Sequence, residues 1–348
     1  MTAGSESSET SLELYDYFLP HAAVAQQPRV DRDGSRMLVL EGASAVSHQV
    51  VRDLPWLLRD GDCLVVNDTR VRAARLRGQV DGREVEILLV REVGAQIFAA
   101  LVRPGRLLRL GRHVRGQGWE AEVVGLWDEH PGGRVVSVRT EAGIALDSVG
   151  EVPLPPYIQS KIADPSRYQT IFAKGPPVSA AAPTAGLHLT EELLARIAAR
   201  GVKICAISLE VGLATFSPIR TENIQDHQMH KERYSVPRAA VMTIQGVRQA
   251  GGRVVAVGTT VARCLESALD RSGAVTAGTG ETDLYLRPGV SFRVVDGLLT
   301  NFHQPRSSLM VLVSAFFGGE EARGAYRQAL DNGYRFLSFG DCMFGWRR

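Results

Sequence analysis

The chain has 348 residues, 45% of them hydrophobic, and a formal net charge of +2. A chain of this length can bury a sizeable core and is expected to form two domains, while its net charge alone does not indicate nucleic-acid binding. The polar residues 1–11 are expected to be disordered and do not resemble a signal peptide. Apolar runs are too short for a bilayer, so we expect a cytoplasmic protein without a membrane partner. The scattered cysteines lack zinc or dithiol spacing and indicate buried, reduced thiols: Cys63, Cys205, Cys264 and Cys342.

Two kinds of pattern follow one another along the chain. From about Val71 to Val152, short segments of alternating hydrophobicity between glycine-bearing turns predict a small antiparallel barrel or sandwich. Further on, the strand-like runs 203–209 and 253–257 each lie next to a helical pattern, Glu191–Arg200 before the first and Val261–Asp270 after the second. This alternation predicts an α/β domain into which the all-β unit is inserted.

The segment around His188 combines a turn with a helix start. Pro183 fixes one backbone angle and Gly186 allows angles closed to other residues, so we expect a sharp turn before the histidine. Thr190 is a typical N-cap for the following helix, which is expected to end at Gly201. A histidine at a helix N-terminus is suited to chemistry. The alternative is a loop histidine beside a capped helix.

Polar side chains also follow the predicted strands. The segment Asn67-Asp68-Thr69-Arg70 follows a strand-like run, and Asn301 and His303 follow Leu298-Leu299 in the same style. Strand ends are where α/β sheets bind ligands, so we favour a site here over a hydrogen-bonded turn with an Asp–Arg pair. Asp341 follows an aromatic run that also looks like a strand.

The tripeptide Gly258-Thr259-Thr260 lies between a predicted strand and a predicted helix. Free backbone amides at a helix start, together with two hydroxyl groups, make a small anion site suited to a carboxylate. The alternative is ordinary N-capping of the helix by Thr260.

The segment Asp226–Glu232 concentrates two imidazoles and two carboxylates. His227 and His230 are three residues apart and would share one face of a helix, which is also a metal-ligand spacing. No third ligand of known placement accompanies them, so we expect no metal and favour acid–base or substrate-orienting work.

Five arginines recur at every third position with no acidic residue between them: Arg103, Arg106, Arg109, Arg112 and Arg115. Such a series could bind a phosphate backbone, and the alternative is a solvated loop and strand face. On a strand, a three-residue period places alternate arginines on opposite faces, so only some would contact one ligand.

Taken in order, these segments resemble the S-adenosylmethionine:tRNA ribosyltransferase-isomerase family of the queuosine pathway. The likeness covers nearly the whole chain and also includes Asp16-Tyr17-Phe18-Leu19-Pro20, Leu154-Pro155-Pro156-Tyr157-Ile158, Arg167-Tyr168-Gln169-Thr170, and Tyr334-Arg335-Phe336 through Gly340-Asp341. The resemblance implies an α/β domain of residues 12–71 and 153–348, with an inserted β-barrel domain of residues 72–152.

The resemblance also implies a reaction. The family moves the ribosyl carbons of S-adenosylmethionine onto the aminomethyl group of a 7-deazaguanine in tRNA, releasing adenine and methionine. S-adenosylmethionine is then a co-substrate, no cofactor or metal is bound permanently, tRNA is the partner, and we expect a monomer. Removing a proton beside the sulfonium, protonating adenine and accepting the proton of the amine all need imidazoles or carboxylates.

The candidates for these proton transfers are His188, Glu210, His227, His230 and His303. The candidates for substrate binding are Asn67, Asp68, Arg70, Thr184, Gly186, Thr259, Thr260, Asn301 and Asp341, and those for RNA binding are the five arginines.

Four residues depart from the usual pattern of the family: Glu210 replaces a histidine, Ala214 a glycine, Val290 a tyrosine and Gln304 a leucine. These departures leave open a divergent member that uses S-adenosylmethionine with another amine or base. A non-catalytic RNA-binding protein is a third interpretation, disfavoured because His188, Asn301, His303 and Asp341 are all retained.

Overall fold

The computed structural model describes residues 10–42, 45–212 and 218–348. Ala214 and most of the tail that was expected to be disordered therefore lie outside the described residues. The end of that tail is placed, because the carbonyl of Thr10 accepts a hydrogen bond from the N–H of Ile224 over 2.9 Å. Ser11 caps the first 3-10 helix, η1 (Leu12–Tyr15), by accepting from the N–H of Glu13.

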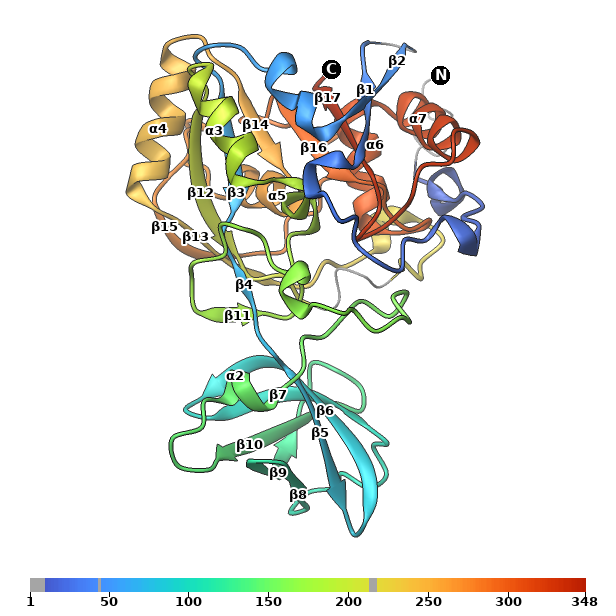
Figure 1. Cartoon of the computed structure of the whole chain (residues 1–348), viewed down its shortest axis with the longest axis vertical. Helices are drawn as coiled ribbons and strands as arrows, with labels where there is room; N and C mark the ends of the chain where they lie inside the picture. The colour runs from blue at the N-terminus through green and yellow to red at the C-terminus, as the bar shows by residue number, and fades with distance from the viewer. Residues whose placement is uncertain (1–9, 43–44, 213–217) are drawn as a thin grey trace. The chain divides into compact units, whose positions relative to one another are not determined.

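The chain divides into two compact units, which are coloured along the chain in Figure 1. The first consists of Met1–Thr69, Pro156–Gly175 and Pro183–Arg348, and the second of Arg70–Pro155 and Pro176–Ala182. The first unit is built around a large sheet with helices, and the second around a closed barrel. The expected fold class, α/β with an inserted antiparallel barrel, is confirmed.

One sheet of nine strands runs through the described part of the first unit, in the order β15-β13-β12-β3-β14-β16-β17-β1-β2. The strands are β1 (Arg36–Leu40), β2 (Val46–Val50), β3 (Cys63–Asn67), β12 (Lys203–Leu209), β13 (Glu232–Val236), β14 (Val254–Val257), β15 (Gly278–Thr282), β16 (Gly297–Asn301) and β17 (Cys342–Trp346). Strands β12, β3, β14 and β16 are parallel neighbours, whereas β17 is antiparallel to β16. All residues of β3, β14 and β16 are buried, as expected for strands covered on both faces.

Helices cover both faces of this sheet. On one face, α3 (Glu191–Ala199) and the 3-10 helix η4 (Val51–Leu57) bury Leu193 and Leu54 against Leu64, Val255 and Leu299 of the sheet. Helices α4 (Arg238–Gln249) and α5 (Thr259–Ser267) also pack on the sheet but contribute no residue to that cluster, which places them on the other face. Helices α6 (Ser308–Phe317) and α7 (Gly319–Asp331) follow β16.

The predicted helix after His188 is confirmed. The hydroxyl of Thr190 accepts a hydrogen bond from the N–H of Leu193 over 3.1 Å, which satisfies one of the free donors at the start of α3. Gly201, with a φ of +81°, follows the last residues of the helix. A left-handed residue at this point ends a helix, so the glycine acts as the expected stop.

The second unit is a closed six-stranded barrel with strand order β10-β7-β6-β5-β8-β9. Its strands are β5 (Arg75–Val80), β6 (Arg83–Gly94), β7 (Ile97–Arg103), β8 (His113–Gly116), β9 (Trp119–Leu126) and β10 (Arg134–Thr140), and a short helix α2 (Leu146–Val149) follows. Alternate residues such as Leu76, Ile87 and Val123 fill the interior. The short strands β4 (Arg70–Val71) and β11 (Pro177–Ser179) pair beside it in this unit.

Among the described helices, none has both the length and the apolar character needed to cross a membrane.

Candidate active site

The candidate residues that follow the parallel strands lie along one edge of the sheet. They are Asn67 and Asp68 at the end of β3, Glu210 after β12, Thr259 and Thr260 after β14, and Asn301 and His303 at the end of β16. Asp341 precedes β17, which runs antiparallel to β16, so it lies at the same edge. Strands β12 and β14 flank β3 on opposite sides, and ligands of α/β proteins bind at the carboxyl edge beside such a change of direction.

His188 ends the 3-10 helix η6 (Thr184–His188), whose first residue Thr184 is half-buried. The imidazole is buried and its Nε2 makes no hydrogen bond of normal geometry with the described residues. Burial lowers the pKa of His188 to about 4, while the negative charge of Asp341 and the side chain of Asn301 act in the opposite direction. His188 is therefore neutral at pH 7 and able to accept a proton.

Gly186 has a packing role in this helix. A Cβ atom at this position would lie 2.7 Å from Cζ of Phe172 and 3.0 Å from Cγ2 of Thr170. The glycine is not among the residues with positive φ. The expectation that Gly186 supplies unusual backbone angles was therefore wrong, because close packing against η6 is what requires it.

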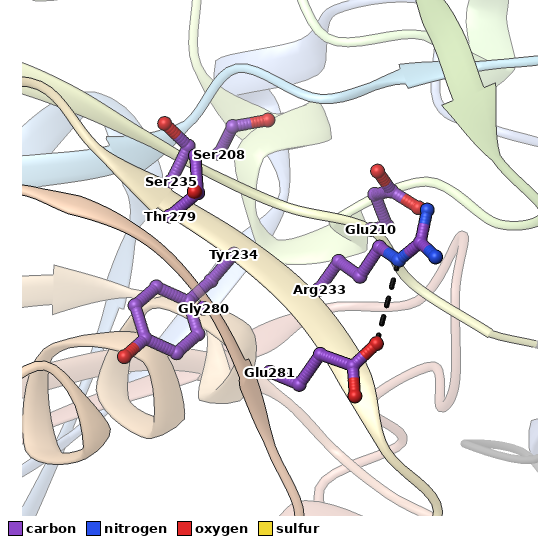
Figure 2. A pocket seen from close by; sticks show the side chains of 8 residues that line it. All are labelled: Ser208, Glu210, Arg233, Tyr234, Ser235, Thr279, Gly280 and Glu281. Carbon is purple, nitrogen blue, oxygen red and sulfur yellow. Dashed lines mark hydrogen bonds and ion pairs between the residues drawn. The ribbon is translucent and has the colours of Figure 1, made fainter.

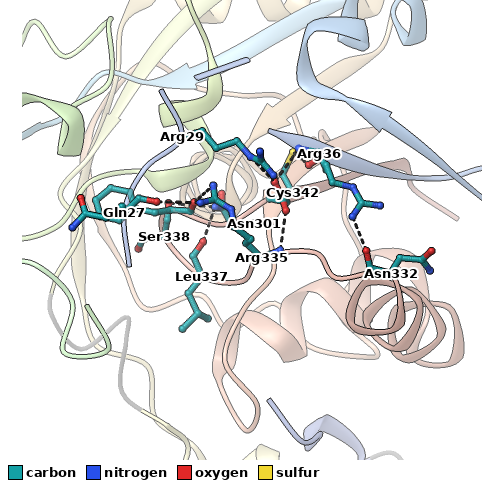
Figure 3. A network of polar contacts seen from close by, with 11 residues as sticks. Gln27, Arg29, Arg36, Asn301, Asn332, Arg335, Leu337, Ser338 and Cys342 are labelled. Atoms are coloured by element: carbon teal, nitrogen blue, oxygen red, sulfur yellow. Dashed lines mark hydrogen bonds and ion pairs between the residues drawn. The ribbon is translucent and has the colours of Figure 1, made fainter. Parts of the chain in front are cut away.

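Asp341 is fully buried and ties three chain segments together. Its Oδ1 accepts from the backbone N–H of Arg36 over 2.9 Å and from Nε of Arg29 over 3.4 Å, and its Oδ2 accepts from the N–H of Arg335 over 2.8 Å. Figure 3 shows these arginines around the network. Charge-assisted bonds of this kind fix both the carboxylate and the segments that donate to it.

The aromatic run before Asp341 is not a strand, contrary to our expectation. Strand β17 begins only at Cys342, and Leu337 has a φ of +69°, which an extended strand does not allow. The Nδ2 of Asn301 donates to the carbonyl of this leucine over 2.9 Å. The amide is thereby oriented, and its buried Oδ1 makes no hydrogen bond with the described residues.

Asn67 and the start of α5 form a second group. The Oδ1 of Asn67 accepts from the N–H of Leu209 and its Nδ2 donates to the carbonyl of the same residue, both over 3.1 Å. Helix α5 begins at Thr259 after Gly258, which has a φ of +93°, so the alternative in which Thr260 caps the helix does not hold. The Thr260 hydroxyl instead accepts from Asn67 over 3.4 Å. Asn67 thus joins the ends of β3 and β12 and reaches the start of α5.

Glu210 lines a pocket of about 330 Å³ where β12, β13 and β15 meet. Figure 2 shows its lining: Ser208, Glu210, Arg233, Tyr234, Ser235, Thr279, Gly280 and Glu281. The Nε of Arg233 lies 3.5 Å from Oε1 of Glu281. The backbone N–H of Glu210 donates to the carbonyl of Arg233 over 2.9 Å. The pocket has the size of a small-ligand site and is lined by charges of both signs.

Asp68 and Arg70 belong to different compact units of the chain. Asp68 belongs to the first unit, where burial raises the pKa of its carboxyl group and a hydrogen bond with Ser208 partly offsets this rise. Arg70 is exposed and begins β4 in the second unit.

His227 and His230 do not share a helix face, so that expectation was wrong. The 3-10 helix η8 (Ile224–Asp226) ends before them, and they lie in an irregular segment that leads to β13. The His227 ring packs edge-to-face on Tyr285 at 5.4 Å between centroids. Burial and the neighbouring His230 both lower the pKa of His227.

His303 lies on the other side of β16 from Asn301. Its Nε2 is 2.9 Å from Oγ1 of Thr300, and consecutive side chains of a strand point to opposite faces. Its N–H donates to the Tyr326 hydroxyl over 3.0 Å, and the Tyr17 hydroxyl donates to its carbonyl. Burial lowers the pKa of His303 to about 3. Electrostatic interactions thus link His188 to Asp341 and to the side chain of Asn301, whereas His303 lies in a separate group.

The arginine series lies in the second unit and does not form one strand. Arg103 ends β7, Arg115 lies in β8, and a turn segment connects these strands. The alternation across strand faces that we expected does not apply, since all five side chains are exposed. Arg112 makes an ion pair of 3.0 Å with Asp81.

Several residues at the carboxyl edge of the sheet were not named as candidates by the sequence analysis. Arg29 and Arg335 bind Asp341, and Tyr17 and Tyr326 hold His303. Arg335 and Tyr17 lie inside motifs that carried the family resemblance, and this was the only signal that could have pointed to them.

A nine-stranded α/β sheet with polar groups along its carboxyl edge, together with a barrel inserted in the sequence, defines a two-unit α/β protein. The particular family follows from comparison with known proteins. A family model described as "Queuosine biosynthesis protein" matches residues 12–344, and the chain belongs to this family.

Relatives with curated names match over almost the whole chain. A protein of Gloeobacter violaceus named "S-adenosylmethionine:tRNA ribosyltransferase-isomerase" is 46% identical over 99% of this chain and 98% of its own length. A protein of Moorella thermoacetica with the same name is 47% identical over 95% and 98%. The crystal structure of S-adenosylmethionine tRNA ribosyltransferase from Thermotoga maritima is similar with a TM-score of 0.55 and 34% identity, covering 95% of this chain and 99% of that one. Such identities are those of an ordinary member, so the divergent member that the four departures left open is not supported.

Proposed function

We propose that this chain is an S-adenosylmethionine:tRNA ribosyltransferase-isomerase. It moves the ribosyl group of S-adenosylmethionine onto the 7-aminomethyl-7-deazaguanine of a tRNA, giving epoxyqueuosine and releasing adenine and methionine. The observation that carries this proposal is the full-length match to relatives of that name, at 46% and 47% identity. Because that match runs through the whole chain, it disfavours both a small-molecule paralogue and a non-catalytic RNA-binding protein.

The side chains at the sheet edge fit the proton transfers that this reaction needs. His188 and His303 have pKa values lowered to about 4 and 3, so both are neutral at pH 7 and able to take a proton from carbon or from the attacking amine. If His188 takes a proton, the nearby carboxylate of Asp341 stabilises the imidazolium. Burial of His188 also keeps water from reactive intermediates beside it.

The remaining assignments are proposals of the same kind. Glu210 acts on the co-substrate from its pocket, and His227 and His230 orient the substrate. Asn67, Asp68, Thr259, Thr260 and Asn301 bind S-adenosylmethionine at the edge, Thr184 and Gly186 shape its rim, and Arg70 and the barrel arginines Arg103, Arg106, Arg109, Arg112 and Arg115 contact the tRNA. S-adenosylmethionine serves as a co-substrate, without a permanently bound cofactor. We further propose a monomer that acts in the cytoplasm on tRNA, and sedimentation analysis tests the subunit number.

Incubation with labelled S-adenosylmethionine tests the activity. We expect adenine to be released when a tRNA bearing 7-aminomethyl-7-deazaguanine is present, and the label to appear in the tRNA. The same tRNA with guanine at that position is the control, because it lacks the attacking amine. Adenine release at an equal rate without any RNA would contradict the tRNA acceptor.

A further inference from the structure

Four arginines from distant parts of the first unit gather around the Asp341–His188 pair: Arg29, Arg32, Arg167 and Arg335. Arg29 binds the carboxylate of Asp341 directly, and Arg335 donates to it through its backbone N–H. Arg32 bonds to the backbone of Leu187, the residue before His188, and the positive charges of Arg32 and Arg335 both oppose protonation of His188.

Three of these guanidinium groups bond to neutral backbone carbonyls. Arg167 donates to the carbonyls of Arg29 over 2.6 Å and Val30 over 3.1 Å. Arg335 donates to the carbonyls of Gln27 over 3.2 Å and Phe339 over 2.9 Å, and Figure 3 shows Arg335 and Gln27 in this network. Arg32 donates to the carbonyl of Leu187 over 3.1 Å. These bonds hold the arginines in place without neutralising their charge.

Carboxylates do not balance this cluster. Among the described residues, these four arginines form one ion pair, between Arg29 and Asp341. The charge of the exposed Asp164 also acts on Arg32, and that of Asp341 acts on Arg335. Asp31 and Asp33 are the neighbours of Arg32 in the sequence. A carboxylate oxygen of each lies near Nη2 of Arg52 instead, at 3.9 and 3.2 Å. Four guanidinium groups with a single ion pair leave most of the positive charge of this cluster unpaired.

The arginines also repel one another. Burial lowers the pKa of Arg32 and the charge of Arg167 lowers it further, and burial and Arg29 act in the same way on Arg335. In addition, the Nε atoms of Arg167 and Arg335 and the Oγ1 of Thr170 are buried without a hydrogen-bond partner in the described part of the chain. Buried polar atoms are normally hydrogen-bonded to protein or to water, and a bound substrate can also supply the partner.

We propose that these four arginines bind phosphate groups of the tRNA next to the modified nucleotide, a contact separate from the barrel arginines. The inference rests on the proposed function. Guanidinium groups bind phosphate oxygens through paired, charge-assisted hydrogen bonds. A half-exposed group of several arginines (36% of the Arg29 side chain is accessible) matches the phosphates of a nucleotide chain, whereas the carboxylate of S-adenosylmethionine would occupy one guanidinium. The target base is thereby brought toward His188.

The contact is tested by measuring how tightly the modified tRNA binds to the variants Arg29→Gln and Arg32→Gln. Fluorescence anisotropy at several salt concentrations gives these affinities. We expect each variant to bind about tenfold more weakly, because one charged hydrogen bond is lost. The slope of log K against log salt is expected to fall by about 0.7 to 0.9 for each arginine. Arg32→Lys is expected to keep the slope, since it keeps the charge.

Arg196→Gln is the matched control, because this arginine lies on the exposed surface of α3 and its loss changes the net charge equally. The KM for S-adenosylmethionine at saturating tRNA is expected to stay unchanged in both test variants.

Affinity and salt slope equal to those of the control would overturn the proposal. A raised KM for S-adenosylmethionine with normal tRNA binding would assign the cluster to the carboxylate instead. A parallel loss of both affinities would also overturn the proposal, because the arginines would then shape the site rather than contact the tRNA. The anisotropy measurement needs no turnover, so it stands apart from the adenine-release test of the function.

Discussion

The negative charge of the buried Asp341 carboxylate acts on the imidazole of His188. His188 comes from η6, and Asp341 comes from the segment directly before β17. Burial favours the neutral imidazole, whereas the carboxylate favours the imidazolium. A base in this environment is unprotonated before the reaction and gains a stabilising partner once it has accepted a proton. His188 can therefore accept one proton, and Asp341 stabilises the imidazolium that results.

The buried histidines predict how stability depends on pH. Unfolded histidines titrate near 6.5, while folding lowers the pKa of His188 to about 4 and that of His303 to about 3. Below pH 6.5 the unfolded chain binds more protons than the folded one, so both residues destabilise the protein progressively as the pH falls toward these values. Each contributes a slope of up to about 1.4 kcal/mol per pH unit. Urea unfolding of His188→Gln is measured between pH 5 and 7 at intervals of about half a unit. The free energy of unfolding is expected to depend less steeply on pH in this variant than in the wild type.

The control for this measurement is His21→Gln, because the side chain of His21 is exposed and solvated in both states. A pH slope of His188→Gln equal to that of the wild type would show that this histidine is not buried in its neutral form.

Glu210→Gln tests whether a carboxylate acts in the pocket. The amide keeps the shape of the side chain but cannot take a proton, so kcat is expected to fall by about 100-fold or more, with a small change in the KM for S-adenosylmethionine. Glu281→Gln is the matched control, since Glu281 lines the same pocket and pairs with Arg233. Near-normal kcat in Glu210→Gln would remove this residue from the chemistry.

Gly186→Ala tests the close packing of η6. The new methyl group would lie 2.7 Å from Phe172 and 3.0 Å from Thr170, and relief of this overlap must shift the helix that ends at His188. We expect a loss of about 1–3 kcal/mol in the free energy of unfolding, together with lower kcat. Gly246→Ala in α4 meets no atom within 4 Å and is expected to stabilise by about 0.5–1 kcal/mol. Equal stability of the two variants would contradict the packing role.

Local signals were sufficient for much of the fold. Thr190 and Gly201 predict both ends of α3, and the apolar run of β12 predicts that strand with its observed bounds. The aromatic run before Asp341 misled the prediction because its burial has another cause. Phe336 stacks on Phe302 at 4.8 Å between centroids and packs against Tyr326, so tertiary contacts bury it without any strand. Hydrophobic residues alone do not distinguish these two situations.

The candidate site was foreseeable only in part, for a related reason. Asn67 and Asn301 each end a recognisable strand, so their place at the sheet edge follows from the pattern. The arginines around Asp341 lie in loops and in short 3-10 helices, η3 (Arg32–Gly34) and η5 (Pro165–Tyr168), which show no hydrophobic periodicity. Arg29 binds this carboxylate although the two residues are 312 positions apart in sequence. Only the folded structure shows that these arginines gather around one carboxylate.

Asp341→Asn is expected to lower the pKa of His188 below its value of about 4, because the negative charge that stabilises the imidazolium is removed. A weaker base follows, so kcat falls while the KM for S-adenosylmethionine changes little, as befits a positioning residue. Titration of the His188 ring by NMR in labelled protein measures the pKa directly, and circular dichroism confirms that the variant is folded. One amide oxygen can still accept from the N–H of Arg36, whereas an amide nitrogen facing the N–H of Arg335 cannot, so some stability is lost as well. An unchanged pKa in a folded variant would show that Asp341 organises the loop without acting on His188.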